Sequence, residues 1–140
     1  MSESTLREDL IASLRDVYQL KAFASLEDLL QGESLVMQYL AFHQSETLYP
    51  SDLSRELRLS RSRITGALNS LRQKGFVEMQ HSEADRRRVQ VRITSAGLAL
   101  LMEKLGKMDH YFDQMIAGLG DEDSRRLIQL IRRCVEVMTE

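Results

Sequence analysis

The hydrophobic period of the chain changes at Gly75, and this change constrains the fold more than any other feature. Before it, Ile64, Leu68 and Leu71 recur at the spacing of one helix face. After it, the runs FVEMQH and VQVRI alternate with the period of two, which is typical of strands. The intervening SEADRR is longer than a tight turn. The sequence therefore predicts a helix followed directly by a β-hairpin whose loop projects.

Local signals divide the rest of the chain into helices. Pro50 suits the first turn of a short helix, Ser60 is a good N-cap, and Gly75 fits the residue after a helix end. Thr94 and Ser95 begin a further helix. Apolar residues at helical spacing predict helices over residues ~5–24, ~33–44, ~50–58, ~60–73, ~95–118 and ~121–138.

Positive charge is concentrated in one block of a chain whose net charge is −2. The segment from Arg55 to Arg92 holds ten Lys or Arg and four Asp or Glu, a net of +6, and the remainder carries −8. A basic block in an acidic frame is expected of a face that binds a polyanion. A solvated, arginine-rich surface is the alternative.

The two short helices before the hairpin form a predicted helix-turn-helix unit, in which the second helix enters the DNA major groove. Its free face is small, polar and basic, which allows close approach to base edges. An ordinary pair of antiparallel helices with a solvated face remains the alternative. The candidate readout residues are Arg61, Ser62, Arg63, Thr65, Gly66 and Asn69. The candidate phosphate contacts are Arg55, Arg72 and Lys74.

The hairpin that follows carries Arg86, Arg87 and Arg88 in its loop. Helix, turn, helix and basic hairpin is the order of a winged helix, and an arginine-tipped wing can enter a narrow minor groove. The arginines thus stand where a wing would meet DNA.

These residues resemble the MarR family of bacterial transcriptional regulators over essentially the whole chain. The resemblance is carried by Asp85-Arg86-Arg87, the strand VQVRIT, Gly97 three residues later, and LNSLRQKGFVE over 68–78. It implies that Arg87 is the wing-tip arginine in the minor groove and that Asp85 orients arginine side chains. It also implies that residues 60–73 are the recognition helix.

The same resemblance implies a homodimer in which the first and last helices interlock. This agrees with the terminal helices themselves, whose apolar stripes exceed what one small winged-helix core can cover, although packing within the chain is the alternative. The predicted fold is mainly α with a small β-hairpin wing. Residues 1–32 and 95–140 are expected to be dimerisation helices, and 33–94 the winged helix-turn-helix, with the wing at about 76–94.

The chain departs from the family pattern at two places. Gly66 stands where many members have an arginine after the threonine of the recognition helix. Met79 and Gln80 occupy the stretch of the first wing strand where many members have an arginine. Base readout is therefore expected to depend more on Arg61, Arg63 and Asn69.

Family members usually respond to a signal, and the resemblance implies a small-molecule effector bound between the dimer helices and the winged domain. Cys134, the one cysteine, lies on the apolar stripe of the last helix and is interpreted as an inert core thiol. Some members bind zinc, and the nearest candidates are Glu33, His43, Asp109 and His110, but they lack the spacing of a zinc motif. We expect no metal and no cofactor.

The sequence offers no phosphate-binding glycine loop and no credible nucleophile–base pair, so we do not expect an enzyme. No apolar run is long enough to span a membrane and the N-terminus does not look like a signal peptide, which favours the cytoplasm. The expected partners are duplex DNA, a second copy of the chain and an effector. A winged-helix module that binds protein instead of DNA is the competing hypothesis.

Overall fold

The computed structural model describes residues 3–140, with side chains from residue 5 onward. Helices dominate this part of the chain, and one antiparallel hairpin provides its strands. The elements are α1 (Glu3–Tyr18), α2 (Lys21–Leu29), α3 (Gly32–Phe42), α4 (Pro50–Leu57), α5 (Arg61–Gln73), β1 (Val77–His81), β2 (Val89–Ile93), α6 (Ser95–Leu119) and α7 (Asp121–Met138).

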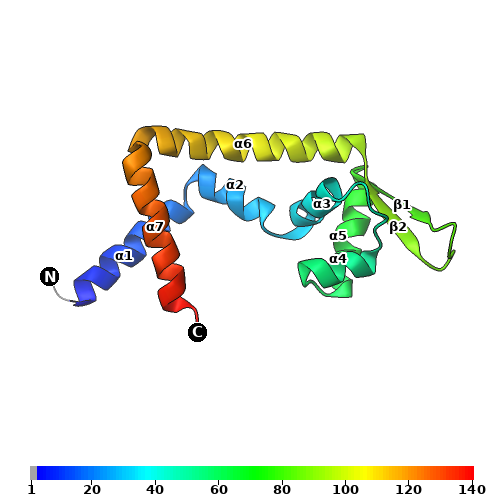
Figure 1. The fold of residues 1–140 in the computed structure, drawn as a ribbon, viewed down its shortest axis with the longest axis horizontal. Coiled ribbons are helices and arrows are strands. Elements are labelled where there is room, and N and C mark those ends of the chain that lie inside the picture. The colour runs from blue at the N-terminus through cyan, green and yellow to red at the C-terminus, as the bar shows by residue number, and fades with distance from the viewer. Residues whose placement is uncertain (1–2) are drawn as a thin grey trace.

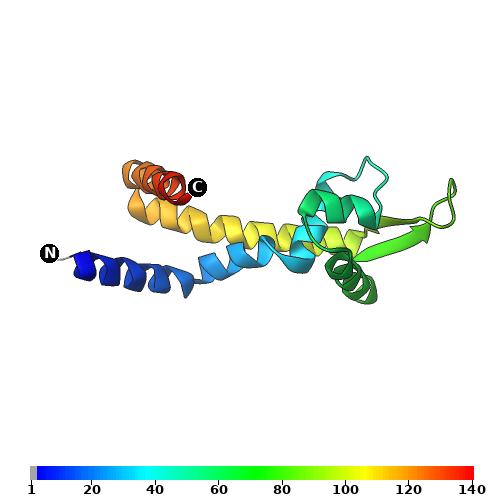
Figure 2. The same cartoon turned by 90° about the horizontal axis from the view of Figure 1, so that it is seen from below.

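The molecule is elongated along α6, which runs beside α2 and α3 (Figure 1). The winged helix-turn-helix of α3, α4, α5 and the hairpin lies at one end, and α1 and α7 lie at the other. The two terminal helices cross in the first view, but Figure 2 shows them apart from each other. They therefore leave their faces open within a single chain.

The hydrophobic core belongs to the winged end. Leu53 from α4 and Ile64 from α5 are fully buried, and Val91 brings β2 onto the same cluster. The cluster comprises Val36, Met37, Leu40, Leu48, Leu53, Ile64, Leu68, Leu71, Val77 and Val91. The predicted helix-turn-helix and wing are thus one packed unit.

The predicted helix ends are confirmed by their hydrogen bonds. Ser60 Oγ accepts from the Arg63 backbone N–H at 3.2 Å, and Thr94 Oγ1 accepts from that of Gly97 at 3.1 Å. Pro50 opens α4, and Gly75 takes a positive φ of 81° after α5. These caps satisfy backbone groups that a helix terminus would leave unpaired.

The predicted single helix over residues ~5–24 is wrong, because the chain forms α1 and α2 with a break at residues 19 and 20. Leu20 takes an extended conformation and begins α2. The redirected helix buries Ala22 and Leu29 and packs along α6, while α1 keeps its apolar face exposed. No glycine or proline marks this break, so packing on α6 accounts for it.

The hairpin pairs Val77 with Ile93 and His81 with Val89. The segment before α4 joins it, since the Val91 backbone N–H donates to the carbonyl oxygen of Leu48 at 2.8 Å. The wing is therefore held at its base by backbone from a different part of the winged domain.

The terminal helices expose large apolar side chains, including Leu10 on α1 and Ile131 on α7. Cys134 is exposed as well, so its interpretation as a core thiol is wrong for the single chain. Within the described residues, no helix has the length and apolar character needed to cross a membrane.

Candidate nucleic-acid interface

Helix α5, the predicted recognition helix, has one buried face and one exposed face. Ile64, Leu68 and Leu71 are buried against α3, α4 and β1. Every readout residue predicted on this helix is exposed: Arg61, Ser62, Arg63, Thr65, Gly66 and Asn69. A Cβ atom at Gly66 would meet nothing within 4 Å, which leaves an open surface at this helix turn. The free face of α5 can therefore approach another molecule closely.

Two of the three predicted phosphate contacts already have carboxylate partners. Arg55 donates to Asp52 at 3.0 Å and to Glu56 at 3.5 Å, and these hydrogen bonds raise the pKa of Arg55. Lys74 lies 2.8 Å from Glu33 of α3. Arg72 is exposed. The charge available to a phosphate is thus smaller than the count of basic residues suggests.

Glu33 takes part in an ion pair that spans the winged domain. Partial burial raises the pKa of Glu33, but hydrogen bonds from Lys74 and Ser70 outweigh it and hold the pKa below its ordinary value of 4.5. The pair fixes the C-terminal end of α5 to the start of α3.

The wing loop is closed by hydrogen bonds around Asp85. Its Oδ1 accepts from the Arg87 backbone N–H at 3.0 Å and from Arg87 Nε at 3.2 Å. The Arg88 backbone N–H donates to the Asp85 carbonyl oxygen at 3.0 Å. The Arg87 side chain is 91% exposed while this contact holds its Nε. Its remaining guanidinium nitrogens point into solvent and can act as donors.

The three arginines are not equivalent. Arg88 lies over the ring of Tyr49, with its guanidinium carbon 3.6 Å from the ring centroid. The carbonyl oxygen of Arg86 is 2.7 Å from Nδ1 of His81. Neither Tyr49 nor His81 was among the site residues predicted from the sequence. Tyr49 is distant from the wing in sequence, and no local pattern links them.

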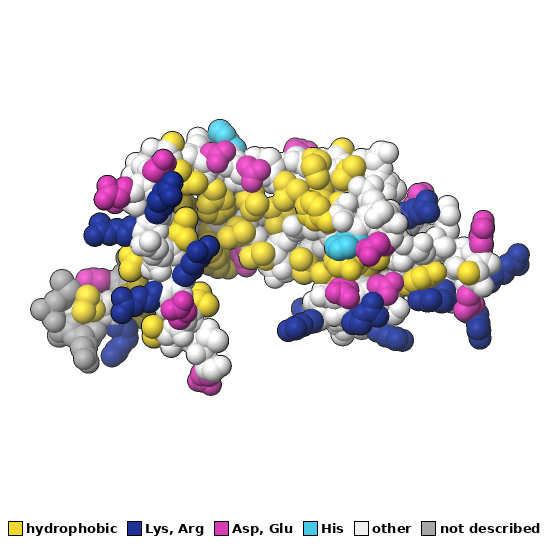
Figure 3. Space-filling view, viewed as in Figure 1, with side chains coloured by type: hydrophobic (Ala, Val, Ile, Leu, Met, Phe, Trp, Pro, Cys, Tyr) yellow, Lys and Arg dark blue, Asp and Glu magenta, His cyan; other side chains and the backbone are white. Residues whose placement is uncertain are grey.

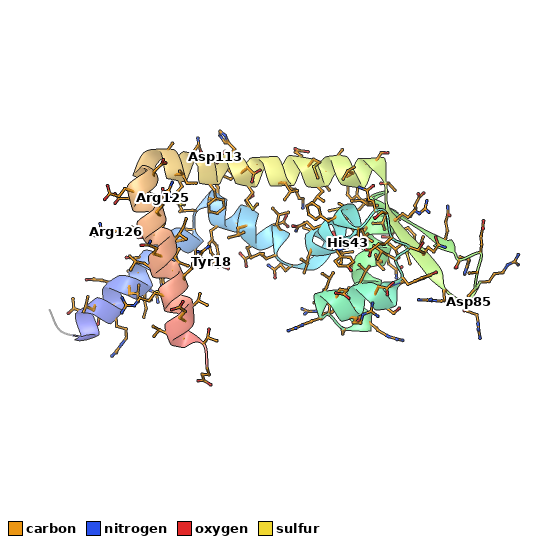
Figure 4. The ribbon with its side chains drawn as sticks, in the orientation of Figure 1. Tyr18, His43, Asp85, Asp113, Arg125 and Arg126 are labelled. Carbon is orange, nitrogen blue, oxygen red and sulfur yellow. The ribbon has the colours of Figure 1, made fainter. Side chains whose placement is uncertain are left out.

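Basic side chains gather along the α4–α5 edge and on the hairpin, as Figure 3 shows. Asp85 lies on the wing loop at the opposite end of the molecule from Arg125 and Arg126 of α7 (Figure 4). The helix and the wing therefore place basic side chains at the same end of an elongated molecule, with acidic side chains among them.

A groove of about 490 Å³ adjoins the recognition helix. It separates the α2–α3 connection from α5 and has a mainly apolar wall with one charged side chain, Arg63. Its lining residues are Leu30, Gln31, Gly32, Leu35, Leu59, Arg63, Gly66 and Ala67.

The structure separates the zinc candidates. Glu33 pairs with Lys74, and His43 Nδ1 lies 2.8 Å from the Tyr39 carbonyl oxygen with its ring stacked on that of Tyr39. Asp109 and His110 lie in the middle of α6. Among the side chains described, no three His, Cys, Asp or Glu residues are arranged to hold a metal ion.

Comparisons with known proteins agree with this architecture. The MarR family model matches residues 28–88, which run from the end of α2 into the wing. The transcriptional repressor MprA of Escherichia coli K12 is 28% identical over 104 residues, which are 73% of this chain and 59% of that protein. The chain thus spans about three fifths of the length of this curated relative.

Solved structures show the same fold. The YusO protein of Bacillus subtilis superposes with a TM-score of 0.76 at 20% identity, covering 97% of this chain and 99% of that one. A point mutant of Staphylococcus aureus MepR, bound to an oligodeoxyribonucleotide, has a TM-score of 0.65 at 18% identity and covers 99% of both chains. The winged helix-turn-helix region of the chain therefore matches the MarR family, and the chain as a whole shares the fold of these solved structures.

Proposed function

We propose that the protein is a homodimeric transcriptional regulator that binds a pseudo-palindromic duplex operator. The observation that carries the proposal is the shared exposure, at one end of the molecule, of the α5 polar face and of Arg87 on the wing. A major-groove helix beside a minor-groove wing needs this combination. A protein-binding module has no need for an arginine aimed by a carboxylate.

The proposed contacts with DNA are of three kinds. Arg61, Arg63 and Asn69 read base edges, with Ser62, Thr65 and Gly66 forming the surface that lets them approach. Arg72, Arg55 and Lys74 contact phosphates, the last two after exchanging their carboxylate partners for DNA. Arg87 enters the minor groove, held by Asp85.

The partner copy covers the apolar faces of α1 and α7. Leu6, Leu10 and Leu14 repeat every four residues on α1, and each is more than half exposed. The exposed apolar residues of α7 include Leu127, Leu130, Ile131, Val135 and Met138. Exposed apolar faces this large indicate an interface. Two-fold symmetry then sets two half-sites about one helical turn apart.

We propose repression relieved by a small molecule, with the groove beside α5 as the effector site. Ethidium is bound by S. aureus MepR in one solved structure, which supports a ligand-responsive function for this fold. A ligand in this groove contacts both α5 and the α2–α3 connection. It changes DNA affinity only if it binds the two dimer geometries with different affinities. DNA as the target places the protein in the cytoplasm.

The test is a fluorescence-anisotropy titration against DNA from upstream of the gene, at two salt concentrations, beside scrambled DNA. Arg87→Ala is compared with Arg125→Ala, an arginine removed from α7 at the opposite end of the molecule. We expect selective binding whose log affinity falls with log salt by about 0.9 per phosphate contacted, weakened by Arg87→Ala only. Equal binding to both DNAs with no effect of Arg87→Ala contradicts the proposal and favours the protein-binding module.

A further inference from the structure

We infer that Tyr49 and Arg88 form an anchor that sets the position of the wing, so that Arg88 is a positioning residue and Arg87 the arginine that enters the groove. The inference rests on the proposed DNA-binding function. It assigns to Arg88, predicted from the sequence as one of the wing residues that contact DNA, a role in holding the wing in place. Its basis is that Arg88 is already engaged by the protein, whereas the donors of Arg87 beyond Nε face solvent.

The backbone of Tyr49 is fixed before its side chain makes any contact with the wing. Its N–H donates to Asp52 Oδ2 at 2.9 Å, and its carbonyl oxygen accepts from the backbone of Asp52 at 2.9 Å and of Leu53 at 3.3 Å. Leu53 is fully buried in the core. The aromatic ring therefore projects from a point that is rigid with respect to the helix-turn-helix.

Three links join this segment to the wing. The Leu48 carbonyl oxygen accepts from the Val91 N–H, the Tyr49 ring carries the Arg88 guanidinium, and Tyr49 Oη lies 3.4 Å from Ser82 Oγ. Ser82 is almost completely buried although its neighbours His81 and Glu83 are exposed. A cation over an aromatic face is attracted by the ring quadrupole. Only the first link is backbone, so the side chain of Tyr49 supplies the two links nearest the loop.

Hydrogen bonds connect Arg88 to the rest of the loop. The Ser82 N–H donates to the Arg88 carbonyl oxygen at 2.8 Å, and the Arg88 N–H donates to that of Asp85. Asp85 in turn holds Arg87. Fixing Arg88 on Tyr49 therefore fixes the direction in which Arg87 leaves the loop. Replacing Tyr49 removes the anchor without changing the charge of the wing, so that only the orientation of the loop is affected.

Limited trypsin digestion of the free protein tests the anchor without DNA, because the loop contains its own cleavage sites. Cut sites are identified by mass spectrometry in Tyr49→Leu, Tyr49→Phe and Arg88→Met. We expect Tyr49→Leu and Arg88→Met to raise cleavage after Arg86 and Arg87 several-fold. Tyr49→Phe keeps the ring and should restore most of the protection. Unchanged wing cleavage in both Tyr49→Leu and Arg88→Met overturns the inference.

DNA binding supplies the second measurement. From the size of a cation–π contact, Tyr49→Leu should weaken operator binding by about two- to tenfold. Combining it with Arg88→Met should cost little more than either change alone. Arg92→Met is the matched control, since it removes one exposed arginine charge from β2, whereas the cation over the Tyr49 ring is Arg88. Its effect should add to that of Tyr49→Leu.

Different results would contradict the Tyr49–Arg88 anchor and the proposed DNA-binding function. If Arg88 contacts DNA independently of Tyr49, the two substitutions are additive and the anchor is overturned while DNA binding stands. If the parent protein binds no DNA selectively, the proposed function fails, and the proteolysis still decides whether Tyr49 holds the wing. If circular dichroism shows that Tyr49→Leu does not fold, the Arg88→Met variant alone tests the anchor, because Arg88 is exposed and its replacement leaves the core intact.

Discussion

Lys104 of α6 donates to Asp28 of α2 at 2.9 Å and to Ser34 of α3 at 3.0 Å, although 76 and 70 residues separate them in the chain. Ser34 is nearly completely buried and donates to the same Asp28 carboxylate at 3.2 Å. This triad joins the long helix α6 to α2 and to α3, the first helix of the winged domain.

Replacing Lys104 should weaken this junction. We expect Lys104→Met to lower the free energy of unfolding by about 0.5–1 kcal/mol, since the ion pair is only partly shielded from solvent. Urea denaturation at fixed protein concentration measures the change. Lys107→Met, an exposed lysine on the same helix, is the control and should stay within about 0.5 kcal/mol of the parent. Equal effects of the two substitutions would show that the triad contributes nothing.

The Glu33–Lys74 pair predicts a pH-dependent part of stability. Because the folded-state pKa of Glu33 lies below 4.5, its stabilising effect is present above that pH and is lost as the pH falls through the folded value. Glu33→Gln should therefore be less stable than the parent at pH 7, and the difference should shrink at about pH 3. Thermal unfolding across this range checks it. A difference that stays constant with pH contradicts the role of the ionised carboxylate.

Replacing Asp85 should change DNA affinity in the direction opposite to the one that net charge alone predicts. Removing a carboxylate from a DNA-binding loop should raise DNA affinity if only net charge matters. Because Asp85 aims Arg87, we expect Asp85→Ala to weaken operator binding, by about three- to tenfold for one lost charge-assisted contact. Glu83→Ala, which removes an exposed carboxylate from the same loop, should keep or raise the affinity. Anisotropy titration at one salt concentration compares them, and stronger binding by Asp85→Ala would refute the aiming role.

A side chain at position 97 should destabilise the protein by steric overlap. A Cβ atom there would lie 2.1 Å from the Phe76 carbonyl oxygen, so α6 or the start of β1 must shift. We expect Gly97→Ala to destabilise the protein by about 2–3 kcal/mol. Gly66→Ala, in open space on α5, should stabilise it by about 0.5–1 kcal/mol. Chemical denaturation of the two variants gives the comparison. Similar values would mean that the close approach at Gly97 relaxes without cost.

The exposed face of α7 predicts the oligomeric state. Ile131→Glu places a charge in the proposed interface and should yield monomers by sedimentation or light scattering at micromolar concentration. The thiol of Cys134, exposed in the single chain, should react slowly with a thiol reagent in the parent dimer and rapidly in Ile131→Glu. Arg125→Glu adds the same side chain to a charged position of α7 and should remain dimeric. A parent protein that sediments as a monomer contradicts the interface.

Local features of the sequence were sufficient to predict most of the helices and both strands. In capping a helix, Ser60, Gly75 and Thr94 act on backbone groups within three residues or through their own dihedral angles, so this effect can be predicted without knowing the fold. The alternation of VQVRI likewise predicts a strand from adjacent residues. The break between α1 and α2 has no such signal, because packing of Ala22 and Leu29 causes it.

Which basic side chains are engaged within the protein could be decided only from the tertiary structure. The sequence by itself determined that positive charge lies on a helix and on a following hairpin, because composition and period are properties of consecutive residues. Only the fold decided that Lys74 meets Glu33, that Arg88 rests on Tyr49, and that Arg87 remains available. These pairings join residues up to 41 positions apart. Side-chain partners at such separations are set by how the helices and the hairpin pack around their common core.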